Sequence, residues 1–426
     1  MIDIKKIVED KDYVIKHLNM RGTDYSSKIE EALSTYNEYT ELVKNNEDIQ
    51  AEVNTKSKLI GKYKQQGKNV ESLLGEISSL KDSLQDDKVK FLREKFQGIL
   101  HEIPNMLQED TPIGDDDEDN VEVRLVGEKP SFNFEVKEHF EIGEDLGEMD
   151  FERAVKLAKS RFILNRGSIA KLERVLMQFM LDEQVKKGYI EHNVPFVANE
   201  DTLFASGQLP KFDEDLFELS KNAKEDDEFE NDRRFFLIPT SEVVLANLHR
   251  DEIIDYNSLP LKYTAFSACF RKEAGGAGRD TKGMIRVHQF GKVELFKYTR
   301  PEDSNQELEG MVNDAEDILK KLNIHYRVIR LCSGDVGMGA SKTYDIEAWF
   351  PAQEKYREIS SCSNVTDYQA RRAKIRMKDN DGNTIHPHML NGSGLPTGRL
   401  VAAIIENYQN ADGTFDVPEV LKKYYI

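Results

Sequence analysis

A long stretch without proline, residues 28–100, limits the possible folds of this chain more than any other segment. Apolar residues that recur every three or four positions lie on one face of a helix and can form a seam with a second helix. The sequence KQQGKN around Gly67 interrupts this spacing, so we expect the chain to reverse there. We therefore predict two long antiparallel helices in a coiled-coil hairpin, each about 50–60 Å long at ~1.5 Å per residue, that projects into solvent. The two seam series are Leu42, Asn46, Ile49, Val53, Ile60 and Tyr63, and then Val70, Leu73, Ile77, Leu80 and Leu84.

Five lysines cluster near the expected tip of this hairpin, and no acidic residue lies between positions 53 and 70. A run of like charge is most often a solvated helix face. Here the basic charge gathers at one end of an arm, while the whole chain carries a net charge of -19. That asymmetry favours contact with a phosphate backbone, since lysine and arginine are the groups that neutralise phosphates. The lysines are Lys56, Lys58, Lys62, Lys64 and Lys68.

Bulk properties exclude several classes of protein. The acidic total argues against a general nucleic-acid binder outside the local basic cluster. The three cysteines, Cys269, Cys332 and Cys362, have no close spacing, which excludes a Cys-rich zinc site and a disulfide framework. The charged N-terminus has no apolar signal segment, and no run approaches the ~18 apolar residues of a membrane helix. We therefore expect a cytoplasmic protein with no membrane partner.

The composition divides the chain into three regions. We expect a helical arm over residues 1–110, an acidic linker over 111–122 and a globular domain over 123–426. The acids at 115–119 are interpreted as solvated and not metal-binding, and 213–232 as an acidic surface insertion.

Strand-like and helical runs alternate in the globular region, which predicts an α+β fold with an antiparallel sheet flanked by helices. The strand-like runs are Arg234–Pro239, Lys262–Arg271, Met284–Thr299, Ile324–Leu331 and Tyr344–Phe350. The helical runs are Phe151–Lys159, Ala170–Lys187, Asp303–Leu322 and Leu400–Tyr408.

The glycine-rich segments do not match known nucleotide loops. GSGLPTG at 392–398 has the wrong spacing for a dinucleotide fingerprint, and GDVGMG at 334–339 precedes a strand-like run. No P-loop, no G-x-S-x-G elbow and no zinc-helix partners for the HPH sequence at 386–388 occur.

The segment 263–296 predicts a hairpin whose polar residues share one face. A loop of roughly 12 residues joins its strands, and loops of that length are often functional. Arg271 at a strand end, Glu273 two residues later and Phe290 across the hairpin can serve one ligand. The guanidinium can bind a phosphate, the carboxylate can bind an amine, and the aromatic ring can stack on a base.

These residues carry a family resemblance. FRKE…RVHQF resembles motif 2 of the class II aminoacyl-tRNA synthetases, and the longer run FRKEAGGAGRDTKGMIRVHQFGKVELF resembles the seryl-tRNA synthetases in particular. GQLPKF (207–212), PTSEVVLANLHRDEI (239–253), YREISSCSN (356–364) and NGSGLPTGRLVAAIIENYQ (391–409) match in the same order, as does the N-terminal hairpin. The resemblance spans nearly the whole chain. It implies activation of L-serine with ATP to seryl-adenylate, followed by transfer to tRNA(Ser); charging of selenocysteine tRNA stays open.

The resemblance implies a role for each matching residue in ATP binding. Arg271 would bridge the substrate carboxylate and the α-phosphate, Glu273 would hold the adenine amino group, and Phe290 would stack on the ring beside Val287. Arg399, the motif 3 arginine, would contact the γ-phosphate. Arg271 and Arg399 are the expected catalytic residues. Glu358 and Ser361 would ligate Mg²⁺. Further ATP contacts are implied for Lys272, Arg286, Ile359 and Ser360.

The same resemblance implies the serine pocket and the contacts with macromolecules. The pocket would contain Thr240, Ser241, Glu242, Glu294, Asn391 and Ser393 together with Arg271. Pro195 matches the motif 1 proline at the homodimer interface of the family. Arg279 and Lys282, in the loop, would join the five arm lysines in contacting tRNA. Two departures stand out: TSE in place of TAE adds a hydroxyl at Ser241, and GLPTGRLVAA in place of GLAVGRTLVA leaves the helix register after Arg399 to be determined.

Other classes of function also fit parts of the sequence. A ligase that loads a carrier protein would not need the basic arm, and an inactive RNA-binding paralogue should have lost Arg271, Glu273 or Arg399. Activation of threonine or proline is disfavoured by the TSE and NGSG segments.

Overall fold

The computed structural model describes residues 1–220, 234–274 and 282–425, which divide into two compact units at residues 104 and 105. Most of the predicted acidic insertion, 221–232, lies outside the described residues, as does Arg279. Within the described part of the chain, the helices are all too short or too polar to cross a membrane.

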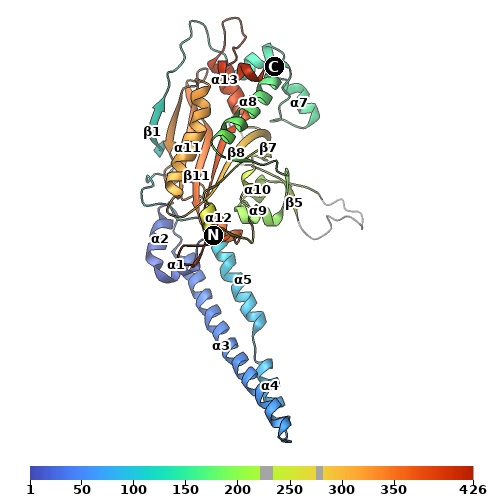
Figure 1. Ribbon diagram of the computed structural model, residues 1–426. Helices are drawn as coiled ribbons and strands as arrows, with labels where there is room; N and C mark the ends of the chain where they lie inside the picture. The colour runs from blue at the N-terminus through green and yellow to red at the C-terminus, as the bar shows by residue number, and fades with distance from the viewer. Residues whose placement is uncertain (221–233, 275–281, 426) are drawn as a thin grey trace. The chain divides into compact units, whose positions relative to one another are not determined.

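The first unit is a helical hairpin, as its spacing predicts (Figure 1). Its seam is apolar, with Ile29, Val53, Ile77 and Phe96 buried. Tyr36 meets the Phe96 ring edge-on at 5.3 Å between centroids. Its helices are α1 (Ile4–Glu9), α2 (Lys11–Asn19), α3 (Ser26–Gln65), α4 (Glu71–Asp82) and α5 (Asp86–Glu102).

The second arm of this hairpin is not one long helix, so the prediction of two long helices was wrong in that respect. The chain breaks between α4 and α5, at residues 83–85. Asn46 of α3 lies opposite the break, where its side chain accepts a hydrogen bond from the Gln85 amide at 3.3 Å and donates one to Asp86 at 3.1 Å. A polar side chain in the seam thus satisfies a backbone amide that a continuous helix would have paired internally.

The second unit is built on a large sheet. Among the described residues this sheet has eight strands, antiparallel except for the parallel pair β2 and β7. In spatial order they are β1 (Val121–Val126), β9 (Tyr326–Arg330), β10 (Lys342–Phe350), β11 (Lys355–Thr366), β14 (His388–Pro396), β8 (Gln289–Thr299), β7 (Leu261–Phe270) and β2 (Ile190–Glu191). There are also two small sheets of three strands each among the described residues. One consists of β13 (Thr384–Ile385), β12 (Arg376–Lys378) and β6 (Ile253–Ile254). The other consists of β3 (Val197–Asn199), β5 (Phe235–Leu237) and β4 (Phe217–Glu218).

Three long helices, α8 (Gly167–Lys186), α11 (Ser304–Lys321) and α13 (Thr397–Asn407), pack against the large sheet (Figure 1). Alternate residues of β8, such as Val293 and Leu295, enter this core, so Lys292 and Glu294 face the other way. The predicted α+β class is confirmed. The shorter helices are α6 (His139–Asp145), α7 (Phe151–Leu157), α9 (Glu200–Ser206), α10 (Glu242–Leu245) and α12 (Tyr368–Arg372).

Three predicted element boundaries need correction. The helix expected over Ala170–Lys187 already begins at Gly167. The strand expected from Met284 begins only at Gln289, because the preceding backbone is bonded elsewhere: the Met284 amide donates to His139 and the His288 amide to Arg161. The last long helix begins at Thr397 and not at Leu400, which places Arg399 in its first turn and settles the helix register that follows it.

Candidate active site

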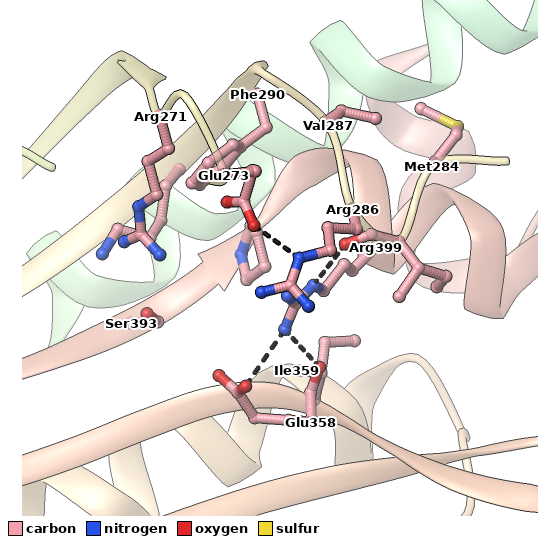
Figure 2. Close-up of a pocket in the computed structure, with 13 residues that line it drawn as sticks. Arg271, Glu273, Met284, Arg286, Val287, Phe290, Glu358, Ile359, Ser393 and Arg399 are labelled. Carbon is pink, nitrogen blue, oxygen red and sulfur yellow. Dashed lines mark hydrogen bonds and ion pairs between the residues drawn. The ribbon is translucent and has the colours of Figure 1, made fainter. Parts of the chain in front are cut away.

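A pocket on the polar face of the large sheet collects most of the residues that the sequence suggested for ATP (Figure 2). β8, β11, β14 and α13, with the segments that follow β7 and precede β8, supply its walls. It is lined by Arg271, Glu273, Met284, Ile285, Arg286, Val287, Phe290, Lys292, Glu358, Ile359, Ser393, Pro396 and Arg399.

The end of β7 places Arg271 and the start of β8 places Phe290. The guanidinium carbon of Arg271 lies 5.2 Å from the centre of the Phe290 ring. Arg271 is oriented through Nε, which donates to the Pro239 carbonyl at 3.3 Å, and its amide donates to the His288 carbonyl at 2.9 Å. Arg271 and Phe290 therefore present a cation and an aromatic face together, groups that can contact a phosphate and a base.

Glu273 follows in a backbone conformation that L-residues rarely adopt, with φ +53°. Its carboxylate accepts a hydrogen bond from Nε of Arg286 at 2.5 Å (Figure 2). Lys272, between Arg271 and Glu273, has an exposed side chain, and its amide donates to the Asp215 carbonyl at 2.9 Å. The strained backbone at Glu273 aims this carboxylate into the pocket.

Arg399 of α13 crosses to the facing strand β11. Its Nη1 donates to the Glu358 carbonyl at 2.8 Å and lies 3.3 Å from the Glu358 carboxylate, while Nε donates to the Ile285 carbonyl at 3.1 Å. Partial removal from water by the pocket walls alone would raise the pKa of Glu358. The charge of Arg399 and its hydrogen bond have the larger combined effect, so the pKa of Glu358 is lowered.

A β-bulge brings Glu358 and Ser361 to the same side of β11. The pairing with β10 shifts register between Ile346 and Glu347, so residues three apart share a face. Asp345 pairs with Ser361 on that face, and its Oδ1 is buried without a hydrogen-bond partner in the described structure. Burial, and then the nearby Glu358 carboxylate, raise the pKa of Asp345 well above its ordinary value.

Ser360, which the resemblance placed near ATP, points elsewhere. It is fully buried, and its hydroxyl donates to the Ser393 carbonyl at 2.6 Å. Ile359 lines the pocket beside it.

A second group of polar residues adjoins the pocket at its inner end. The Thr240 hydroxyl donates to Glu294 at 2.9 Å, and the Lys292 ammonium lies 2.5 Å from the same carboxylate oxygen. Ser393 pairs with Glu294 across β14 and β8, so their side chains face the same way. Ser241 is fully buried and donates to Ser267 at 2.6 Å, so its additional hydroxyl is satisfied inside the wall.

Glu242 lies beside this group and is held by two amides. Its Oε1 accepts hydrogen bonds from Gln369 at 2.7 Å and from Asn391 at 3.1 Å. Burial, reinforced by the Glu294 carboxylate, raises the pKa of Glu242 to about 7, although the Gln369 hydrogen bond and the Lys292 charge oppose the shift.

Sequence reasoning did not assign roles to Lys292, Gln369 or Asp345. Lys292 had a usable signal, because it lies between Phe290 and Glu294 on the same strand face. Gln369 and Asp345 had none, since their positions depend on how α12 and β10 pack.

The remaining predicted residues are not among those that line this pocket. Pro195 is exposed, next to Phe196 and Val197, which are each 38% exposed. Lys282 lies 5.8 Å from the centre of the Phe140 ring. The five arm lysines belong to the first unit: Lys56 pairs with Glu76 and Glu52, and Lys58, Lys62, Lys64 and Lys68 are exposed.

An antiparallel sheet with helices on its apolar face, an Arg–Glu–Phe set on one strand pair and an arginine in the first turn of the following helix define a class II aminoacyl-tRNA synthetase. Two family models match the chain: the tRNA synthetase class II core domain (G, H, P, S and T) over residues 224–408, and the seryl-tRNA synthetase N-terminal domain over residues 1–107.

Relatives match over the full length. A serine–tRNA ligase of Fervidobacterium nodosum is 47% identical over 100% of this chain and 98% of its own, and one of Cellvibrio japonicus is 46% identical over 100% and 97%. The crystal structure of seryl-tRNA synthetase from Pyrococcus horikoshii complexed with ATP superimposes with a TM-score of 0.89 at 37% identity, covering 100% of this chain and 98% of that one. The chain therefore belongs to the seryl-tRNA synthetase family, and its enzymatic activity is serine–tRNA ligation. The expected family and activity are confirmed.

Proposed function

We propose that the pocket described above binds ATP and that its inner end binds L-serine. The convergence of Arg271, Phe290 and Arg399 on one cavity carries this proposal. Adenine stacks on Phe290. The Glu273 carboxylate accepts a hydrogen bond from the adenine amino group, and its present hydrogen bond from Arg286 weakens. Arg271 contacts the α-phosphate and Arg399 the γ-phosphate.

The inner polar group suits a small amino acid with a hydroxyl. Glu242 and Asn391 take the substrate ammonium group, and Thr240, Glu294 and Ser393 surround the hydroxyl. Because Glu294 is 1% exposed, an amino acid without the hydroxyl leaves buried polar groups unpaired. That cost favours serine over alanine.

The reaction proceeds in two steps and needs no covalent enzyme nucleophile. The serine carboxylate attacks the α-phosphate in line, and pyrophosphate leaves with the bond electrons. A ribose hydroxyl at the 3′ end of tRNA(Ser) then attacks the acyl carbon of the seryl-adenylate, and AMP leaves. Arg271 and Arg399 stabilise the charge that develops on the phosphates.

The corner formed by Glu358 and Ser361 fits Mg²⁺. Carboxylate and hydroxyl oxygens face one side of the sheet there, and the adjoining Asp345 Oδ1 lacks a hydrogen-bond partner among the described residues. Magnesium prefers such oxygen ligands and, when bound, neutralises phosphate oxygens. We propose that Glu358 and Ser361 hold this ion.

The partners follow from exposed features of each unit. We propose that residues 1–110 form the tRNA-binding arm through its lysine cluster, that residues 111–122 link it to the catalytic domain 123–426, and that Arg279 and Lys282 also contact tRNA. The arrangement around Pro195 supports a homodimer, because the next two residues, Phe196 and Val197, are each 38% exposed and leave apolar surface uncovered. We also propose a cytoplasmic location, which is consistent with a role in charging tRNA for translation.

Amino-acid-dependent ATP–pyrophosphate exchange tests the proposed site. With each of the twenty amino acids supplied in turn, we expect exchange with serine only, and Arg271→Ala should reduce it by at least about 100-fold. Exchange with another amino acid, or unchanged exchange in Arg271→Ala, would contradict the assignment. Exchange with serine but no charging of total tRNA would favour a carrier-loading ligase.

A further inference from the structure

His139 connects the nucleotide pocket to the far end of helix α13, although it lies outside the residues assigned above. It is the first residue of α6 and is 1% exposed. Its Nδ1 lies 2.7 Å from Glu406 Oε1, and the Met284 amide nitrogen lies 3.0 Å from its Nε2. A backbone amide only donates, so Nε2 is the acceptor and Nδ1 carries the proton. The imidazole is thus a neutral link that donates to Glu406 and accepts from Met284.

Glu406 is a fixed anchor for this link. It is fully buried on α13, seven residues after Arg399. Its Oε1 also accepts from the His139 amide at 3.2 Å, and Oε2 accepts from the Ala352 amide at 3.3 Å. With both carboxylate oxygens bonded, the position of the imidazole relative to α13 is set.

The other side of the imidazole fixes the chain that forms one wall of the pocket. Met284 lines the pocket, and the carbonyl of the next residue, Ile285, accepts from Nε of Arg399. Gly283 has φ +80°, and a Cβ there would lie 2.3 Å from His139 Nε2. Only glycine allows the backbone to approach the ring this closely.

We propose that His139 is a positioning residue for ATP, acting through Met284 and Ile285 on Arg399. It touches no substrate. By holding the Met284 amide, it keeps the Ile285 carbonyl where that carbonyl orients the Arg399 guanidinium, and it keeps the neighbouring Arg286 on the pocket wall. This inference rests on the proposed ATP site.

A pair of substitutions separates the two bonds of the ring. In His139→Asn, the amide nitrogen of the introduced side chain can reach the place of Nδ1, so this variant keeps the donor to Glu406 and loses the acceptor for Met284. His139→Gln can place its amide oxygen near Nε2, so it keeps the acceptor and loses the Nδ1 donor. In serine-dependent exchange, His139→Asn should raise the KM for ATP roughly tenfold, the equivalent of one lost hydrogen bond. The KM for serine should change less than about twofold, and His139→Gln should keep the KM for ATP within about threefold of the wild type.

Equal effects of the two variants, or equal increases in both KM values, would overturn the proposal, as would no effect of His139→Asn in an active enzyme. If the wild type itself shows no serine-dependent exchange, that result contradicts the proposed function, and the inference about His139 falls with it. A measurement on the wild type does not depend on variant folding: ¹⁵N NMR of histidine-labelled protein should show His139 as the neutral Nδ1–H form. A proton on Nε2 would rule out the bond from Met284 and with it the proposal.

Discussion

At the scale of single residues, the site uses carboxylates whose surroundings push their pKa values in opposite directions. Removal from water favours the protonated form of both Glu242 and Glu358. Beside Glu358, the Arg399 guanidinium reverses that tendency, whereas beside Glu242 a second carboxylate, Glu294, reinforces it. One glutamate is thus ionised before substrate arrives, and the other titrates near neutrality.

Binding of serine should therefore depend on pH. Because the pKa of Glu242 is raised to about 7, this group is largely neutral at pH 6 and ionised at pH 8. Only the ionised form attracts the substrate ammonium group, so the KM for serine in the exchange assay should fall as pH rises from 6 to 8. Glu242→Gln should bind serine weakly and without this pH dependence. A wild-type KM that is the same at both pH values would show that Glu242 is already ionised.

Arg399 needs its forked shape as well as its charge. It donates to two carbonyls on opposite walls, Ile285 and Glu358, which a lysine ammonium cannot reach together. Arg399→Lys should lower kcat/KM for ATP by about 100-fold with little change in Tm. Arg153→Lys, at an exposed ion pair with Asp150, is the matched control and should behave like the wild type. Near-normal activity of Arg399→Lys would reduce the role of this residue to charge alone.

Sequence reasoning succeeded at this scale where neighbouring residues on one strand or motif carry the chemistry. Arg271, Glu273 and Phe290 belong to a single hairpin, and the structure brings them together. It missed His139 and Gln369 because each meets its partner across more than 100 residues of chain, through packing that no local spacing encodes.

At the scale of elements, two central strands gave no strand signal in the sequence. β11 and β14 contain serine, asparagine and glycine where strands usually carry β-branched or aromatic residues. Small polar groups such as Ser393 occupy the face that lines the site. On the opposite, core-facing side, Gly392 leaves no room for a Cβ against Cys362 and Met311. Small polar residues on the site face and a glycine on the core face therefore leave β11 and β14 without the usual strand composition, whereas β10, which is rich in aromatic and β-branched residues, was predicted.

The edge strand β1 depends on one ion pair with α11. Arg124 forms two hydrogen bonds with Glu316, at 3.0 and 2.5 Å, and Tyr326 donates to the same carboxylate at 2.8 Å. Arg124→Ala leaves a fully buried carboxylate without its main partner, so we expect a loss of about 2–3 kcal/mol in unfolding free energy.

Denaturant unfolding measures this loss, and hydrogen exchange should increase first in β1. The double variant Arg124→Ala/Glu316→Gln should recover part of the stability, because it removes the stranded charge. The wild-type contribution should also fade on acidification: burial alone raises the pKa of Glu316, but the Arg124 hydrogen bond lowers it, so the stabilisation is lost as pH falls through that lowered pKa. Equal stability of Arg124→Ala and the wild type would contradict this account.

At the scale of the whole molecule, the two units divide the chemistry. The pocket lies entirely within residues 105–426, and the lysine cluster lies within residues 1–104. The ends of the hairpin meet, since the Lys28 ammonium lies 2.8 Å from the Glu102 carboxylate. A deletion of residues 28–100 therefore joins neighbouring backbones.

This deletion should keep serine-dependent exchange within about threefold of the wild type while charging of tRNA falls by at least about 100-fold, because phosphate contacts supply much of the affinity for nucleic acid. Both assays are run on the same preparation, with a glycine linker at the junction. Replacing Lys58, Lys62, Lys64 and Lys68 with Glu should reproduce the charging defect without the deletion. Full charging by either variant would show that the arm is not needed for tRNA recognition.

The most direct test of the assigned pocket is a crystal structure with a non-hydrolysable analogue of seryl-adenylate. We predict the adenine on the Phe290 ring with its amino group at Glu273, the phosphate mimic at Arg271, and the seryl hydroxyl between Thr240 and Glu294. An analogue bound elsewhere, or in this pocket with its adenine and serine ends exchanged, would contradict the account.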